Sequence, residues 1–180
     1  GSSEGYYANG LALIFPNTKL LAIDINGKDI KKLTRIAKIN SIKTIETSNE
    51  NATKTLTSFD PELSYFIFSD IESFEFKVFN TNNVKNLINS DLIIEMHFKP
   101  NSENFIVERE ECISRFNNSH TFEILQLIRI LKENNAECST YLENITLKYT
   151  KIFVQINREP SYEWIILRSI SKNRLKKIFK

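Results

Sequence analysis

Glycine is the residue type that this sequence most clearly lacks. The four glycines stand at positions 1, 5, 10 and 27, so no glycine follows Gly27. Phosphate-cradling loops, dinucleotide-binding turns and the nucleophile elbow of hydrolases need glycine where backbone approaches a ligand or adopts a positive φ. None of these motifs can therefore lie beyond residue 27, and the turns there must be built from Asn, Asp, Ser and Pro.

Cysteine and long apolar runs are also scarce. The two cysteines, Cys112 and Cys138, are too few for a disulfide framework or a cysteine zinc site. They are interpreted as two buried thiols, with a single disulfide bridge as the alternative. Every apolar run is far shorter than the roughly 20 residues that span a bilayer, so a soluble domain without a transmembrane helix is expected.

An excess of one charge is missing as well. Lys and Arg number 24 against 22 Asp and Glu, a net charge of +2. A dedicated nucleic-acid binder usually carries a larger basic excess, so the overall charge assigns no class of partner. Gly1 and Ser2 are interpreted as a cloning remnant and are set aside from the fold.

Apolar periodicity predicts two principal helices. Ile30, Leu33 and Ile36 recur at helical spacing, which predicts a shorter basic amphipathic helix over about 28–40. The apolar residues that follow Ser119 predict a long, mostly buried helix over about 119–134. Its position is interpreted as the core, and half of a partner interface is the alternative.

The remaining segments predict an α+β fold with antiparallel sheet in one domain over residues 3–180. A turn at Pro16-Asn17 separates a strand that begins at Leu11 from a strand over about 19–25. Further strands are expected at about 42–48, 54–59, 65–79, 92–98, from 105 onward, 138–147, 149–157 and 162–170, with a short helix over 84–88.

The order of these elements suggests a tandem pseudo-repeat. Pro16-Asn17-Thr18 and Pro100-Asn101-Ser102 both read as strand-turn-strand devices at a spacing of 84 residues. Two pseudo-equivalent halves, about 10–90 and 91–172, would then share one core. The alternative is that an Asn-rich and Ile-rich composition produces similar hairpins without a duplication.

No residue is assigned to catalysis, to a cofactor or to a metal. His97 and His120 stand outside the HxH and HExxH patterns of metal sites. A calcium loop starting at Asp24 would need Gly at its sixth position and Glu at its twelfth, where Asp29 and Arg35 stand. A closed apolar pocket holding Asp24, His97 or His120 among converging polar groups would instead indicate an enzyme.

The leading functional hypothesis is therefore a non-enzymatic protein-interaction or structural module, and the alternative is a nucleic-acid-binding domain. A protein is the first partner expected, nucleic acid is the second, and self-association is compatible with both. A solvated lysine face is the simpler interpretation of the basic helix. The predicted partner-binding surface combines this helix with the basic C-terminal segment and consists of Lys28, Lys31, Lys32, Arg35, Lys38, Arg174, Lys176 and Lys177.

Overall fold

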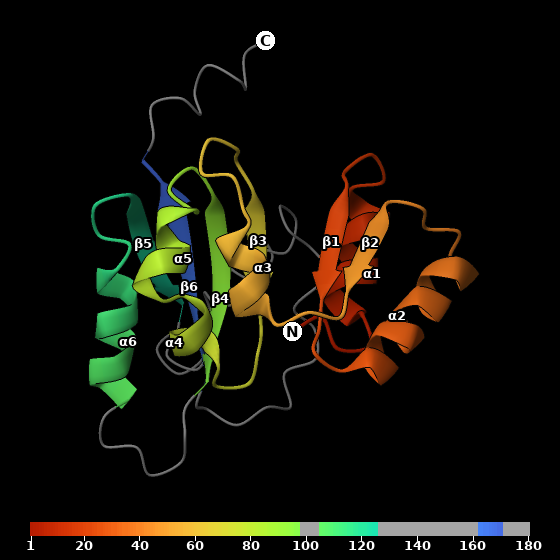
Figure 1. Ribbon diagram of the computed structural model, residues 1–180, viewed down its shortest axis with the longest axis horizontal. Helices are drawn as coiled ribbons and strands as arrows, with labels where there is room; N and C mark the ends of the chain where they lie inside the picture. The colour runs from red at the N-terminus through yellow and green to blue at the C-terminus, as the bar shows by residue number, and fades with distance from the viewer. Residues whose placement is uncertain (98–104, 126–161, 171–180) are drawn as a thin grey trace, which may run out of the picture.

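The computed structural model describes residues 1–97, 105–125 and 162–170 (Figure 1). The strands of these residues form a two-stranded sheet and a four-stranded sheet. Among the helices described, none combines the length and the apolar character that crossing a membrane requires.

The two-stranded sheet is a parallel pair. Leu20 lies opposite Ile45 and Ile23 lies opposite Ser48. A parallel pair needs a crossover connection, which α2 supplies between the strands. The α2 helix begins where the Asn26 side chain accepts a hydrogen bond from the Lys28 N–H at 3.1 Å. The elements of this part are α1 (Tyr6–Ile14), β1 (Leu20–Ile23), α2 (Gly27–Ile39) and β2 (Ile45–Ser48).

The four-stranded sheet has the order β3-β4-β6-β5. Strand β3 pairs with β4 in parallel, and β6 runs antiparallel to both β4 and β5. The elements of this part are α3 (Ala52–Thr57), β3 (Phe66–Ser69), α4 (Glu75–Val78), α5 (Thr81–Lys85), β4 (Asp91–His97), α6 (Phe105–Ser114), β5 (His120–Leu125) and β6 (Tyr162–Ser169).

The larger core lies between this sheet and the helices α3 to α6 that stand in front of it in Figure 1. Leu92, Ile94 and Met96 of β4 are fully buried, while Phe79 and Phe116 come from the helical layer. Burying a side chain of this size stabilises the folded state by about 1.5–3 kcal/mol. The two-residue spacing of the buried β4 residues leaves Glu95 and His97 for the other face of the strand.

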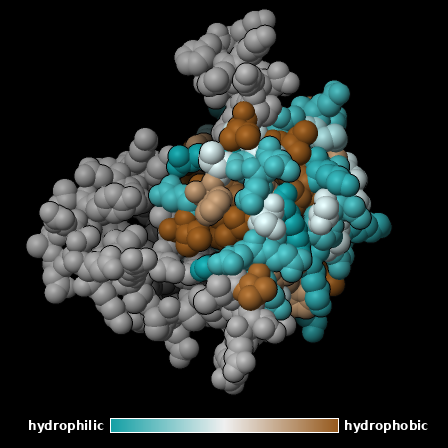
Figure 2. Space-filling view, turned by 90° about the vertical axis from the view of Figure 1, so that its left-hand side faces the viewer, coloured by the Kyte–Doolittle hydropathy of each residue, from teal (hydrophilic) through white to brown (hydrophobic). Residues whose placement is uncertain are grey.

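Apolar side chains are also exposed on the side of the molecule where α6 and β5 lie, which Figure 2 shows. Val107 of α6 is 62% exposed and Phe122 of β5 is 52% exposed. Strand β5 is at the end of the strand order, so only one of its edges pairs with another described strand.

The prediction of a basic amphipathic helix is confirmed. The prediction of a long buried helix is wrong over the residues that the structure describes. Helix α2 covers almost the whole predicted range of 28–40. His120–Leu125 is strand β5, paired with β6 from His120 opposite Ser169 to Leu125 opposite Trp164. A short apolar run fits a buried helix and a strand equally well, and pairing with a distant strand decides between them. Residues 126–134 lie outside the described part.

The strand predictions had mixed outcomes. The strands predicted at 19–25, 42–48, 92–98 and 162–170 are confirmed as β1, β2, β4 and β6. Helices α1, α3 and α6 occupy the places of the strands predicted from Leu11, over 54–59 and from 105. Within 65–79 only Phe66–Ser69 is a strand. The short helix expected over 84–88 is α5, which begins earlier, and 138–147 and 149–157 lie outside the described residues.

The pseudo-repeat and the purely antiparallel sheet find no support. The Pro16-Asn17 turn follows helix α1 and precedes strand β1, whereas residues 100–102 are preceded by strand β4 and followed by helix α6. The two motifs therefore connect elements in the opposite order. Mixed α/β architecture is what the structure shows, with parallel pairs β1-β2 and β3-β4 beside the antiparallel strands.

Candidate functional site

The first five residues of the chain form a turn between the carboxyl ends of β1 and β3. The Ser2 N–H donates a hydrogen bond to the Ile23 carbonyl at 2.9 Å. A Cβ atom on Gly1 would collide with the carbonyl oxygen of Asp70, and one on Gly5 would collide with Leu33. Gly5 also has a φ of 91°, in the left-handed region that favours glycine. Gly1 and Ser2, set aside above, thus belong to this turn.

Asp24 fixes the turn to the end of β1. Its Oδ2 accepts a hydrogen bond from the Ser3 N–H at 2.7 Å, and its Oδ1 accepts one from the Asn26 N–H at 2.8 Å. The Asn49 side chain donates to the Asp24 carbonyl at 3.3 Å. A glycine turn that opens a helix, followed about 20 residues later by an acidic residue, is the arrangement with which α/β folds bind nucleotide ribose.

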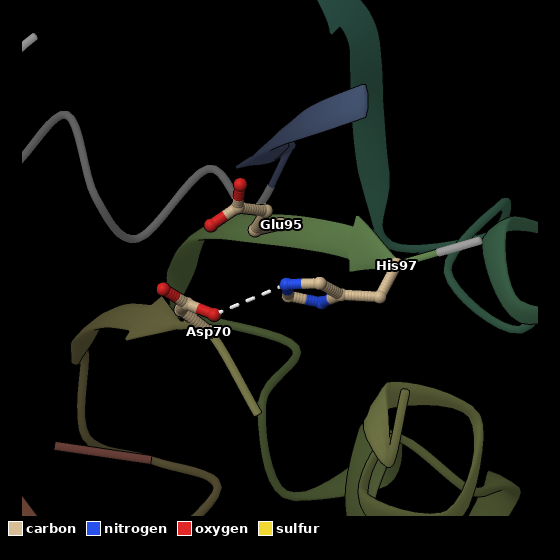
Figure 3. A group of neighbouring side chains, drawn as sticks. All are labelled: Asp70, Glu95 and His97. Carbon is tan, nitrogen blue, oxygen red and sulfur yellow. Dashed lines mark ion pairs between the residues drawn. The ribbon is translucent and has the colours of Figure 1, made fainter. Parts of the chain in front are cut away.

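A second group, the His97 cluster, consists of Asp70, Glu75, Glu95 and His97. Asp70 directly follows β3, Glu95 and His97 belong to β4, and Glu75 opens α4. Figure 3 shows Asp70, Glu95 and His97 converging, and their potential ligand atoms all lie within 4.8 Å of one another. Glu75 is fully buried, while Glu95 and His97 are each 3% exposed. The cluster therefore places charged and polar side chains in the interior of the protein.

Hydrogen bonds and ion pairs orient the imidazole of His97. Its Nδ1 lies 2.9 Å from Oε1 of Glu75, and its Nε2 lies 3.3 Å from Oδ1 of Asp70 and 3.5 Å from Oε2 of Glu72. Burial lowers the pKa of His97, but the hydrogen bond to Glu75 and the charges of Glu75, Asp70 and Glu72 outweigh it, so the pKa is raised. The cluster therefore favours a cation at this position.

The turn after β3 brings the carboxylates back to His97. Glu72 and Ser73 adopt φ values of 50° and 76°, which cost on the order of 1 kcal/mol each for residues other than glycine. The Ile71 N–H donates to Oε1 of Glu75 at 3.2 Å and closes the turn. A strained turn that is held by buried contacts is typical of functional sites.

The predicted partner-binding residues lie elsewhere. Their helix, α2, flanks the β1-β2 sheet at the opposite side of Figure 1 from β4. Lys32 forms an ion pair with Asp29 at 2.8 Å. The assignment of a partner to this surface stays a prediction, because the C-terminal residues Arg174, Lys176 and Lys177 lie outside the described part. The predicted residues on α2 are Lys28, Lys31, Lys32, Arg35 and Lys38, and all are exposed.

The two histidines have different surroundings. His120 is buried away from the cluster, and its Nε2 lies 2.8 Å from the Ser90 carbonyl, to which it donates. Burial lowers the pKa of His120, and hydrogen bonds to backbone carbonyls only partly oppose this. Asp24 and His97 lie at the carboxyl ends of strands β1 and β4, whereas His120 is the first residue of β5.

Sequence reasoning missed Gly5, Asp70, Glu75 and Glu95 as site residues. Gly5 and Asp24 carry a signal, because a glycine turn before a helix is followed 19 residues later by an acid at a strand end. The four residues of the His97 cluster lie up to 27 positions apart, between 70 and 97, and match no short motif.

No family model and no curated protein matches this chain. Several solved structures are similar. A crystal structure of a fibrillarin/Nop5p complex aligns with a TM-score of 0.59 at 9% identity, over 94% of this chain and 70% of that chain. An rRNA methylase from Streptococcus thermophilus aligns with a TM-score of 0.57 at 14% identity, over 95% and 84% of the two chains. The plantazolicin methyltransferase BpumL, in complex with a triazolic desmethylPZN analog and SAH, aligns with a TM-score of 0.58 at 12% identity, over 94% of this chain and 74% of that chain.

The fold of this chain is therefore similar to that of solved methyltransferases. The identities are low, so the similarity concerns the fold alone. It nevertheless overturns the prediction of a non-enzymatic protein-interaction module, because the solved proteins with a similar fold are named as enzymes. The prediction failed because it depended on missing glycines after residue 27, whereas the glycine turn lies before that residue.

Proposed function

We propose that this chain is a methyltransferase that binds an S-adenosyl cofactor at the carboxyl ends of β1 and β3. The observation that carries the proposal is the turn of residues 1–5, tied to Asp24 through the Ser3 N–H. Ligands of open α/β sheets bind outside the carboxyl ends of the strands, where the order of connection reverses. This turn lies between the strands β1-β2 on one side and the strands β3-β4 on the other.

The residues present fit such a cofactor. Ser2 Oγ is buried and has no hydrogen-bond partner within the described residues. Buried polar atoms of this kind need partners, which the polar groups of a nucleoside would supply. The half-buried Asp24 carboxylate accepts one hydrogen bond on each oxygen and retains lone pairs for ribose hydroxyl groups.

When bound, the cofactor supplies a methyl group on a positively charged sulfur. An acceptor that carries its proton, such as an N–H or O–H group, must lose that proton as it gains the methyl group. The groups of this chain that could hold that proton are the buried carboxylates of the His97 cluster, because the Asp70 backbone lies against the turn at Gly1 while its carboxylate approaches His97. Water exclusion follows from the burial of Glu95 and His97.

The test is isothermal titration calorimetry with S-adenosylhomocysteine. The wild-type chain should bind it, and Asp24→Asn should weaken binding at least tenfold, about 1.4 kcal/mol, because the carboxylate is lost. Asp60→Asn is the matched control, since Asp60 is exposed and also accepts a backbone hydrogen bond, from Glu62 at 2.9 Å. Thermal unfolding should show that both variants fold. No heat of binding to the wild-type chain would contradict the proposal.

A further inference from the structure

We infer that Asp70, Glu95 and His97 form a binding site for one divalent metal ion. The three residues can each offer one ligand atom, and these atoms lie within 4.8 Å of one another. Atoms bound about 2.0–2.2 Å from one ion lie at most about 4.4 Å apart, so small side-chain rotations would bring these atoms to one ion. Figure 3 shows the three side chains directed toward one space beside the ends of β3 and β4.

Glu75 provides the outer contact that metal-binding histidines commonly have. A ligating imidazole usually donates its second N–H to a carboxylate, which fixes the ring and the tautomer. Nδ1 of His97 makes this contact with Oε1 of Glu75 at 2.9 Å. Nε2 therefore faces the side on which Oδ1 of Asp70 lies, 3.3 Å away. The ring is held in the orientation that ligation through Nε2 requires.

Oxygen atoms without hydrogen bonds give an independent indication. Glu75 has no exposed surface, and its Oε2 accepts no hydrogen bond from the described residues. Oδ1 of Asp70 also accepts no hydrogen bond from the described residues, although it lies near Nε2 of His97. Buried carboxylates repel one another because they carry the same charge, and burying them destabilises the folded state unless a cation compensates that charge. A divalent ion between Asp70, Glu95 and His97 would do so.

The donor set favours Mn²⁺ or Zn²⁺. Carboxylate oxygens suit Mg²⁺, Ca²⁺ and Mn²⁺, whereas an imidazole nitrogen suits Zn²⁺ and other transition ions. Three protein ligands leave coordination positions for water or for an oxygen of a second molecule. The backbone carbonyl of Asp70 also lies against the turn at Gly1, so the open positions would lie near the proposed cofactor. The metal site goes beyond the proposed function, and metal binding and cofactor binding are measured in separate experiments.

The test uses the full chain, freed of metal with a chelator. Electron paramagnetic resonance of added Mn²⁺ measures the free ion, and calorimetry gives the affinity for Mn²⁺ and Zn²⁺. One ion should bind per chain, and Asp70→Asn should weaken binding more than tenfold. Glu75→Gln should weaken it about 10–100-fold, because Glu75 positions His97 without touching the ion. Asp60→Asn, an exposed acid, should bind as the wild-type chain does.

The two histidines of the sequence give a second measurement that needs no variant. Zn²⁺ should shift the imidazole NMR signals of His97 and leave those of His120, which contacts Ser90 instead, unchanged. Circular dichroism should show that each variant is folded. The inference is overturned if no ion binds stoichiometrically, if Asp70→Asn binds as tightly as the wild type, or if the His97 signals do not move. Binding of S-adenosylhomocysteine without metal would leave the proposed function intact.

Discussion

Nδ1 of His97 lies 2.9 Å from Oε1 of Glu75, and both side chains are almost completely buried. The two residues are 22 positions apart and belong to β4 and α4. Their contact links the turn after β3 to the end of β4 inside the protein. A buried polar pair of this kind stabilises the fold only while both partners are present.

Glu75→Gln should destabilise the protein by about 1–3 kcal/mol, because the amide replaces a charged acceptor that serves His97 and the Ile71 N–H. Glu72→Gln is the matched control, since the Glu72 side chain is 73% exposed and should contribute less than about 0.5 kcal/mol. Urea unfolding of both variants measures the difference. Equal stability of the two variants would show that the buried contact does not contribute.

Gly5→Ala should destabilise the protein by about 2 kcal/mol or more. The φ of 91° disfavours any Cβ, and this atom would collide with Leu33 of α2. Gly10→Ala is the control within the same α1 segment, where a Cβ meets no atom within 4 Å. Alanine should stabilise that position by about 0.5–1 kcal/mol. Chemical denaturation should show a lower free energy of unfolding for Gly5→Ala and a higher one for Gly10→Ala. A lower value for both variants would contradict the geometry of the turn.

His120 should make stability fall in mild acid. Its folded pKa is lowered, so the neutral ring is favoured in the folded protein and the unfolded chain takes up the proton first. The stabilisation is complete above the unfolded pKa of about 6.5 and is lost as pH falls toward the folded pKa, by at most about 1.4 kcal/mol per pH unit. Urea unfolding of the wild type and His120→Gln between pH 5 and 8 isolates this effect. Parallel pH profiles would refute it.

Cys112 should resist alkylation in the folded protein. Burial raises the pKa of its thiol to about 11, although Arg115 opposes this. At pH 8 only about one thiol in a thousand would then be ionised, and the thiolate is the reactive form. In a Cys138→Ser variant, iodoacetamide should label Cys112 slowly without urea and rapidly in urea. Rapid labelling of the folded chain would contradict the buried position.

Several elements could be predicted from the sequence because local signals were sufficient to define them. Helix α2 has an N-cap at Asn26 and an apolar face that includes Leu33, and both signals agree with its observed bounds. Residues 74–78 show the opposite case. The strand predicted over 65–79 would place Phe74 on its buried face and Glu75 on its exposed face, yet Phe74 is 57% exposed and Glu75 is fully buried. One helical turn places Glu75 and Val78 on the same side, so the two-residue period was misleading.

The sequence by itself determined several local features: the absence of glycine after residue 27, the amphipathic helix α2, the Pro16-Asn17 turn and the strand β4. The tertiary structure decided which segments meet. Pairing with β6 made His120–Leu125 a strand, and the parallel connection of β3 to β4 brought Asp70 beside His97. Hydrophobic burial has no direction, and contacts between residues more than 20 positions apart depend on the packing of the whole chain. The candidate site arises from these contacts, so short motifs could reveal only its glycine turn and Asp24.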